Sequence, residues 1–214
     1  MTKTLLASLA LTLAATAAFP APPANREEAL AALEDPVTER RAEAVVWVAN
    51  HGRMDDTALL MKRLHDESAF VRGFAERGLW LLWSRSGDAD IDREMARGVE
   101  AMESGNLAAA VKLFTEVIRR KPEFAEAWNK RATARYLAGE YRASLADCDE
   151  VMRRNPVHFG ALAGYGEIYL QLQEYEKAIE WWRRALQVNP NLLGVQINIR
   201  RAEELLKERR GRST

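Results

Sequence analysis

The sequence predicts an all-α protein built as a stack of antiparallel helix pairs, an α-solenoid. In the C-terminal half, Pro122, Pro156 and Pro190 recur at intervals of 34 residues. In the N-terminal half, a weaker self-match of period 31 lies between Asn25 and Gly87. Apolar residues fall at helical spacing within both repeats, and turn-forming residues separate the helices. Because one helix pair cannot bury its own apolar face, consecutive pairs should stack on each other.

The N-terminus predicts an export signal. Lys3 precedes an apolar run from Leu5 to Phe19, and prolines follow, which is the layout of a secretory signal. The run is shorter than the roughly 20 residues that cross a bilayer. We therefore expect a cleaved signal over residues 1–18, a Pro/Ala-rich leader over 19–25 and a periplasmic or secreted mature protein. The alternative is a retained N-terminal helix or a tail without a targeting role.

Residues 26–87 form the first predicted repeat region. Each copy consists of a helix, a short acidic break and an apolar helix that begins with arginine. The aspartates can accept hydrogen bonds from free backbone N–H groups at helix ends, and the arginines can reach the aspartate of the neighbouring copy. The alternative is an irregular bundle of about four helices. The aligned pairs are Leu33 with Leu64, Asp35 with Asp66, Arg41 with Arg72, Ala44 with Ala75 and Val48 with Leu79.

The polar break from Ser84 to Asp90 marks the predicted boundary between the halves. Because this linker is short, we expect the apolar segment from Leu79 to Trp83 to dock on the first C-terminal repeat. The two halves would then form one continuous superhelix.

The C-terminal region divides into three units, a capping helix and a tail. In the middle unit, a first helix from about Glu126 to Ala138 should end at Gly139 in a left-handed conformation, and a second helix should span Tyr141 to Arg154. Small Ala132 and Ser144 allow these helices to approach closely. The units are 91–124, 125–158 and 159–192, followed by the capping helix 193–210 and the tail 211–214.

These units resemble the tetratricopeptide repeat (TPR) family, with Trp128, Tyr141, Ser144 and Pro156 at the family's key positions. The N-terminal repeats are similar to short bacterial HEAT repeats. The resemblance implies a right-handed superhelix that binds a peptide or protein in a concave groove lined by the first helix of each unit. Glu94 departs from the TPR pattern, because an aromatic residue is usual there.

The resemblance also implies which residues face the groove. Their mixture of apolar, amide and charged groups suits an extended or helical peptide. Each of them could instead be ordinary helix surface. The clamp for C-terminal carboxylates found in some TPR proteins is disfavoured, because Met95, Val99 and Gly164 stand where it needs Lys, Asn and a basic residue. The expected groove residues are Met95, Val99, Met102, Asn129, Lys130, Thr133, Tyr136, Ala163, Glu167, Leu170 and Gln171.

Two further positions call for an explanation. Arg131 stands at an inward position of its helix, and Asp147 lies where a facing carboxylate would be, so we expect a structural ion pair. The alternative is an arginine that binds the partner. Trp181 cannot face the same way as its neighbour Trp182, so it either packs on an adjacent unit or is an exposed anchor for a partner.

The sequence shows no catalytic constellation. The histidines His51, His65 and His158 lack the spacing of a metal site, and the single cysteine, Cys148, falls at a buried repeat position. There is no phosphate-binding loop and no nucleophile elbow. We therefore expect no enzyme activity, no catalytic residue, no metal and no cofactor.

The charge balance and the repeats together suggest the function. The chain has 31 basic and 31 acidic residues, which gives no general attraction to nucleic acid. The leading hypothesis is a non-catalytic scaffold of the periplasm or cell envelope that binds a protein or peptide, without a membrane span after cleavage. The alternatives are an accessory subunit of an envelope enzyme, or a binder of an anionic polymer through the basic C-terminal residues Arg200, Arg201, Lys207, Arg209, Arg210 and Arg212.

Overall fold

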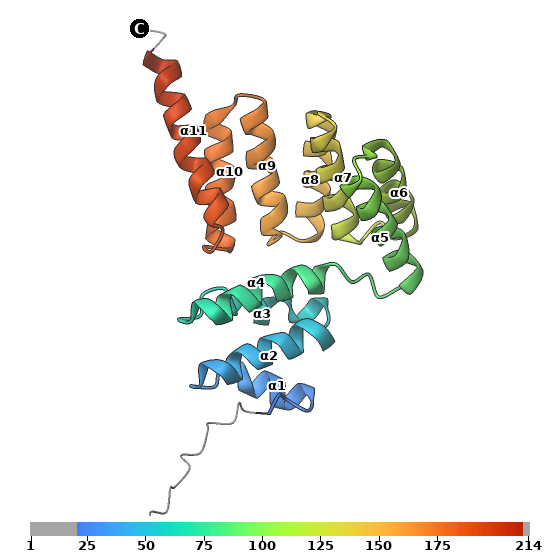
Figure 1. Cartoon of the computed structure of the whole chain (residues 1–214), viewed down its shortest axis with the longest axis vertical. Helices are drawn as coiled ribbons and strands as arrows, with labels where there is room; N and C mark the ends of the chain where they lie inside the picture. Colours follow the sequence, from blue (N-terminus) through green and yellow to red (C-terminus); the bar gives the residue numbers. More distant parts are fainter. Residues whose placement is uncertain (1–20, 212–214) are drawn as a thin grey trace, which may run out of the picture.

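The computed structural model describes residues 21–211, and every regular element in that range is helical (Figure 1). This confirms the predicted all-α solenoid. The predicted signal peptide and most of the predicted tail lie outside the described residues. The helices are α1 Arg26–Ala32, α2 Thr38–His51, η1 Met54–Asp56, α3 Thr57–Arg63, α4 Ala69–Trp83, α5 Ala89–Glu103, α6 Leu107–Arg120, α7 Ala125–Leu137, α8 Tyr141–Arg154, α9 Phe159–Gln171, α10 Tyr175–Val188 and α11 Leu193–Gly211.

The C-terminal part consists of the pairs α5/α6, α7/α8 and α9/α10, and α11 packs on α10 (Figure 1). Each pair turns through one residue with positive φ: Gly105 at 79°, Gly139 at 77° and Gln173 at 58°. Gln173 thus adopts the left-handed conformation for which glycine stands in the other two units. Helix α8 begins and ends where the sequence predicted, and α7 is shifted by one residue at each end.

Close contact between paired helices depends on small residues. A Cβ atom at Gly98 would lie 2.4 Å from the Phe114 ring, and one at Gly166 would lie 2.3 Å from the Trp182 indole. In the middle pair, Ser144 Oγ donates a hydrogen bond of 2.7 Å to the Ala132 carbonyl. The aromatic side chains of α6 and α10 therefore fill space that a glycine on the facing helix leaves open.

The N-terminal part contains two shorter helix pairs, and a hydrogen-bonded ladder joins them. Arg41 binds the Asp66 carboxylate of the next copy through Nε at 2.8 Å and Nη2 at 2.9 Å. Arg72 repeats this arrangement, but its Nε donates to Asn191 Oδ1 at 2.8 Å. Asn191, in the turn before α11, thus takes the place of the aspartate of a third copy.

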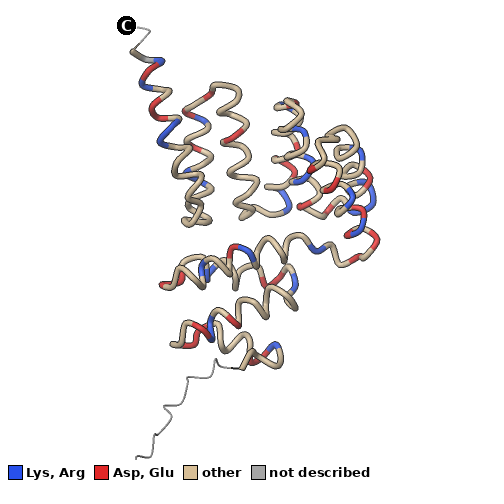
Figure 2. The backbone as a smooth tube through the Cα atoms, viewed as in Figure 1, with Lys and Arg blue, Asp and Glu red and all other residues tan. Residues whose placement is uncertain are grey.

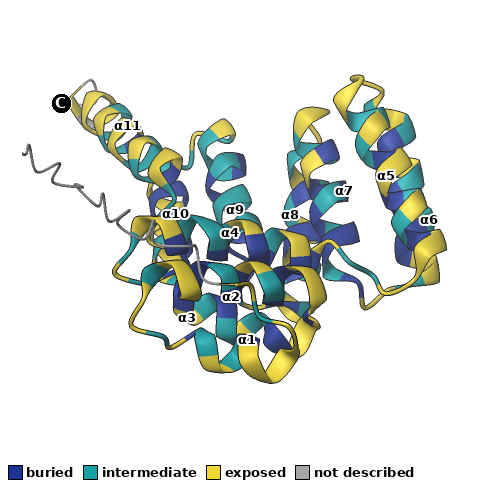
Figure 3. Cartoon of the chain, turned by 60° about the horizontal axis from the view of Figure 1, so that its bottom comes forward, coloured by how far each residue is buried: buried dark blue, intermediate teal, exposed yellow. Residues whose placement is uncertain are grey.

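The N-terminal part does not dock on the first C-terminal repeat, so that prediction was wrong. Trp80 and Trp83 of α4 pack against Phe159, at ring distances of 5.2 and 5.1 Å, and Val188 and Leu192 join the same apolar core. Helix α4 runs beneath the ends of α8 to α11, and both views show it there (Figures 1 and 3). Arg72, Trp80 and Trp83 contact residues of the segments 155–159 and 189–192. The chain therefore folds back on its third C-terminal repeat instead of continuing in line.

Lysines and arginines are interspersed with aspartates and glutamates along the helices (Figure 2). None of the helices between residues 21 and 211 is long and apolar enough to cross a membrane.

Candidate peptide-binding groove

A pocket of about 270 Å³ lies between α7 and α9, the first helices of the second and third repeats. It contains five of the residues that the TPR resemblance implied: Asn129, Thr133, Tyr136, Ala163 and Glu167. The sequence analysis did not assign the other lining residues to the groove. These are Ala132, Ser144, Cys148, Gly160, Ala161, Gly164 and Ile168.

The pocket exists because several of its lining residues are small. A Cβ atom at Gly164 would have only Cys148 Sγ within 4 Å, at 3.8 Å, so the space above Gly164 is open. Gly160 differs, since a Cβ there would lie 2.2 Å from the ring of Trp80. Helix α4 thus packs against the N-terminal end of α9 and holds one side of the pocket in place. The small residues Gly160, Ala161, Ala163 and Gly164, interrupted only by Leu162, were the signal in the sequence that could have located this pocket.

The polar groups of the pocket come mainly from Glu167, Asn129 and Tyr136. Burial raises the pKa of Glu167. The hydrogen bond of 2.7 Å that Asn198 Nδ2 donates to its carboxylate lowers this pKa, but by less than burial raises it. Burial also raises the pKa of the Tyr136 hydroxyl, which accepts a bond of 3.3 Å from Gln171 Nε2. These groups can exchange hydrogen bonds with the backbone of a bound peptide, while the small residues receive an apolar side chain.

The other predicted groove residues lie outside this pocket. Met95 is only 6% exposed and packs in the core of the first repeat, so the expectation that it contacts a partner is corrected. Val99 and Met102 pack against the same core, and Leu170 packs against the core formed by α10 and α11. Lys130 Nζ lies 3.3 Å from Glu126 Oε1. Inward packing of the first repeat explains why its methionines do not reach the groove.

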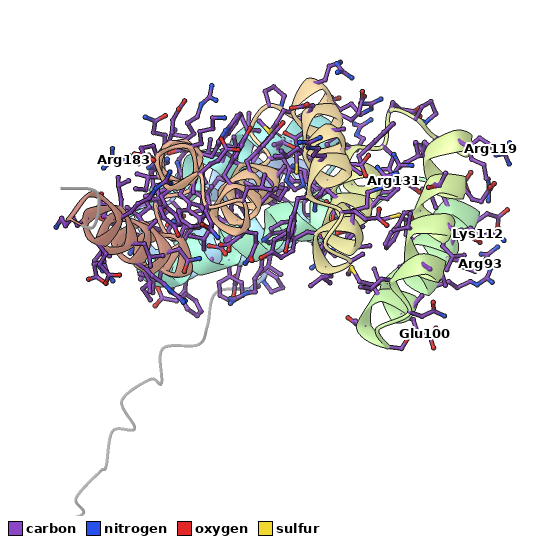
Figure 4. The ribbon with its side chains drawn as sticks, turned by 90° about the horizontal axis from the view of Figure 1, so that it is seen from above. Arg93, Glu100, Lys112, Arg119, Arg131 and Arg183 are labelled. Carbon is purple, nitrogen blue, oxygen red and sulfur yellow. The ribbon has the colours of Figure 1, made fainter. Side chains whose placement is uncertain are left out.

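The structure contains the expected pair of Arg131 and Asp147. Arg131 donates from Nε to Oδ2 at 3.0 Å and from Nη2 to Oδ1 at 2.7 Å, and Asp147 is 2% exposed. Arg135, which the sequence analysis missed, also donates to Asp147 at 2.8 Å, and Arg131 reaches Thr115 Oγ1 at 2.9 Å. Arg131 lies among the helices, whereas Arg93, Lys112 and Arg119 point outward (Figure 4). The pair therefore ties helices together.

Trp181 packs within the fold. Its indole stacks on the ring of Tyr165, with centroids 4.0 Å apart and planes at 12°, and the Arg184 guanidinium lies over the indole at 4.4 Å. Trp181 therefore joins the apolar core between the second and third repeats.

A buried pair of Glu126 and His158 lies where α7, α9 and α4 meet. Ala161 N donates to His158 Nδ1 at 3.1 Å, so the ring proton is on Nε2, which faces Glu126 Oε2 at 3.0 Å. Trp83 stacks on the imidazole at 4.6 Å. Burial opposes ionisation of Glu126, but His158 and Lys130 outweigh it and lower the pKa of this carboxyl. The signal in the sequence was a histidine where the other repeats have Phe124 and Leu192.

The described residues contain no cluster of His, Cys, Asp or Glu that could hold a metal ion. Burial, followed by the charges of Asp147 and Asp149, raises the pKa of the Cys148 thiol to about 12. A thiol with that pKa is protonated at neutral pH and is a poor nucleophile.

Comparisons with known proteins identify the repeats. The sequence profile of the tetratricopeptide repeat matches residues 95–151 and 159–192. A TPR repeat-containing protein of Rhizobium etli is 36% identical over 110 residues, which cover 51% of this chain and 54% of that protein. The Hsp70-Hsp90 organizing protein 1 of Glycine max is 29% identical over 121 residues, covering 56% of this chain and 21% of the relative. This chain thus spans about half of the first relative and about a fifth of the second.

Solved structures agree on the fold. The first TPR of Spaghetti (RPAP3) bound to the HSP90 peptide SRMEEVD superposes with a TM-score of 0.53 at 20% identity, covering 56% of this chain and 96% of that one. The MamA protein superposes with a TM-score of 0.50 at 19% identity, covering 71% of this chain and 83% of that one. The two profile matches lie between residues 95 and 192, so the HEAT-like character of the N-terminal part stays a prediction. Residues 95–151 and 159–192 of this chain are tetratricopeptide repeats.

Proposed function

We propose that this protein is a non-catalytic scaffold of the periplasm or cell envelope that binds a peptide segment of a protein partner between α7 and α9. The observation that carries the proposal is the pocket of about 270 Å³ whose lining combines small residues with Glu167, Asn129 and Tyr136. It offers space for one apolar side chain and hydrogen-bonding groups for the adjacent backbone.

The compared proteins support peptide binding as the mode of action. One solved TPR neighbour holds an HSP90 peptide, and a relative is an Hsp70-Hsp90 organizing protein. In this chain, Met95 and Val99 pack in the first repeat and Gly164 lies in the open pocket, so a basic clamp for a terminal carboxylate is missing at these positions. We therefore expect recognition through an apolar side chain within the bound segment. The envelope location rests on the signal-like order of Lys3, the apolar run and the prolines.

The C-terminal helix gives less support to binding of an anionic polymer. Its basic residues alternate with Glu203, Glu204 and Glu208, and Arg183 of α10 already pairs with Glu203 at 3.0 Å. Helix α11 thus presents both signs of charge, and we do not adopt this second function.

The proposal is tested by filling the pocket. In Gly164→Leu, the new side chain occupies open space and also replaces a glycine inside a helix, so the fold should not be weakened. The matched control is Gly73→Leu in α4, where a Cβ would meet only the end of Arg77, at 4.0 Å. Pull-down from an envelope extract should recover with the wild type and the control at least one protein partner that Gly164→Leu does not recover. Recovery of the same set of partners, in equal amounts, with all three proteins would contradict the proposal.

A further inference from the structure

A second pocket lies in the N-terminal part between α2 and α4, and it shares no lining residue with the groove. Its volume is about 320 Å³. Val46 and Trp47 of α2 and Phe70 and Phe74 of α4 form its apolar wall, and Glu39 and Glu43 of α2 are its acidic groups. Phe70 is 58% exposed and Val46 is 37% exposed, although most large apolar side chains of this part are buried or partly buried. An aromatic wall left open in this way is typical of a binding site.

The aromatic side chains hold one another in place. Phe70 and Phe74 meet edge to face with centroids 4.7 Å apart, and Trp47 stacks on His51 at 4.6 Å. The guanidinium of Arg77 lies over the Phe74 ring at 4.7 Å, although Arg77 does not line the pocket. The ring faces in this region therefore already accept a cation.

The acidic groups lack a cation from the described part of the chain. The basic neighbours on α2 are engaged elsewhere, since Arg40 lies 3.9 Å from Asp35 and Arg41 binds Asp66. Glu43 Oε2 is buried and has no hydrogen-bond partner among the described residues. A buried carboxylate oxygen without a donor is costly, and Glu39, one turn away on the same helix, is exposed, so a positively charged group of a ligand is attracted to this side of the pocket.

We propose that this pocket binds a protein segment that presents an aromatic or aliphatic side chain beside a lysine or arginine. The apolar side chain enters between Trp47 and Phe70, and the basic group meets Glu39 and Glu43. The proposal does not depend on the groove between α7 and α9. It gives the protein a second recognition surface, on the part of the chain that the TPR profiles do not match.

The test is an NMR titration of the full-length, isotope-labelled chain with two tetrapeptides. One is N-acetyl-Phe-Lys-Leu-Arg-amide, and the other replaces both basic residues by glutamate. The indole N–H signal of Trp47, assigned from the variant Trp47→Phe, reports on the pocket. We expect the basic peptide to shift this signal and the amides of 42–50 and 70–74, and the acidic peptide to leave them unchanged.

Two variants separate the contribution of the acidic groups from that of the aromatic wall. Glu39→Gln with Glu43→Gln should raise the dissociation constant of the basic peptide about threefold to tenfold, as expected for two partly exposed ion pairs. Phe70→Ala should abolish the shifts, and because Phe70 is mostly exposed, the fold should persist. The matched control is Glu103→Gln with Glu180→Gln, two exposed carboxylates elsewhere, and it should bind like the wild type.

Several results would overturn the proposal. These are equal binding of both peptides, no binding of the basic peptide up to its solubility limit, and shifts confined to α7 and α9. If the Trp47 signal moved with protein concentration alone, a second copy of the chain would be the occupant instead. Gly164→Leu blocks only the groove and should leave this titration unchanged, so failure here and failure of the proposed function are distinguishable.

Discussion

Helix α9 contains two glycines, two residues apart, for which the structure predicts opposite effects of the same substitution. In Gly166→Ala, the new Cβ would lie 2.3 Å from Nε1 of Trp182, whose indole is fully buried. Ordinary contacts of a Cβ begin near 3.4 Å, so the indole must move by about 1 Å. Such overpacking costs about 2–3 kcal/mol, against a gain in helix propensity of about 1 kcal/mol. The expected net loss is about 1–2 kcal/mol.

Gly164→Ala has no such conflict. Its Cβ would lie 3.8 Å from Cys148 Sγ, which is an ordinary contact. Only the gain in helix propensity remains, so the variant should be about 0.5–1 kcal/mol more stable than the wild type. It also places a methyl group in the groove pocket, so it should bind a partner more weakly although its fold is more stable.

The assay is urea unfolding followed by far-UV circular dichroism. The two midpoints should move in opposite directions, with an unchanged dependence on denaturant. If Gly166→Ala proved as stable as Gly164→Ala, the inferred packing of α9 on α10 would be refuted. If Gly164→Ala bound the partner like the wild type, the pocket would not be where the partner sits.

Three further predictions concern the junction of the two parts and the cysteine. Trp83→Ala should lower the free energy of unfolding by about 3–5 kcal/mol. It should also increase amide hydrogen exchange at residues 155–159 and 189–192 but not in α5. Increased exchange confined to α5 and α6 would mean that the N-terminal part docks on the first repeat. The lowered pKa of Glu126 means that its ionised form stabilises the fold above the unfolded-state pKa of about 4.3, and that this contribution is lost as the pH falls through the lower folded-state value. Urea midpoints measured from neutral to acidic pH should therefore fall less for Glu126→Gln than for the wild type, and parallel curves would contradict the pairing with His158. Cys148, with a pKa of about 12, should resist alkylation by iodoacetamide in the folded protein and react in urea; rapid reaction without urea would show that the thiol is accessible.

The repeats could be predicted from the sequence because local signals agree at each turn. Gly139 and the spacing of the prolines give the ends of α8 to the residue, and the register of the units places Arg131 opposite Asp147. These features depend on residues within one repeat or between neighbouring repeats. Short-range periodicity is sufficient for them.

The arrangement of the two parts could not be predicted in this way. The period of 31 residues indicates that Arg72 needs an acceptor, but not that Asn191, far along the chain, provides it. The same holds for His158, whose position between Glu126 and Trp83 depends on α4 folding back beneath α9. Met95 was assigned to the groove by register, and only the packing of the first repeat shows that it is buried.

The groove can be tested most directly by photo-crosslinking in intact cells. A photoreactive amino acid at Thr133, which is exposed and lines the pocket, should capture a discrete protein partner. The same group at Glu180, exposed on α10 and outside the pocket, should not. The central claim predicts a crosslinked product from position 133 that disappears when Gly164 is also changed to leucine. Products of equal yield from both positions, or a product from position 133 that survives the leucine, would contradict it.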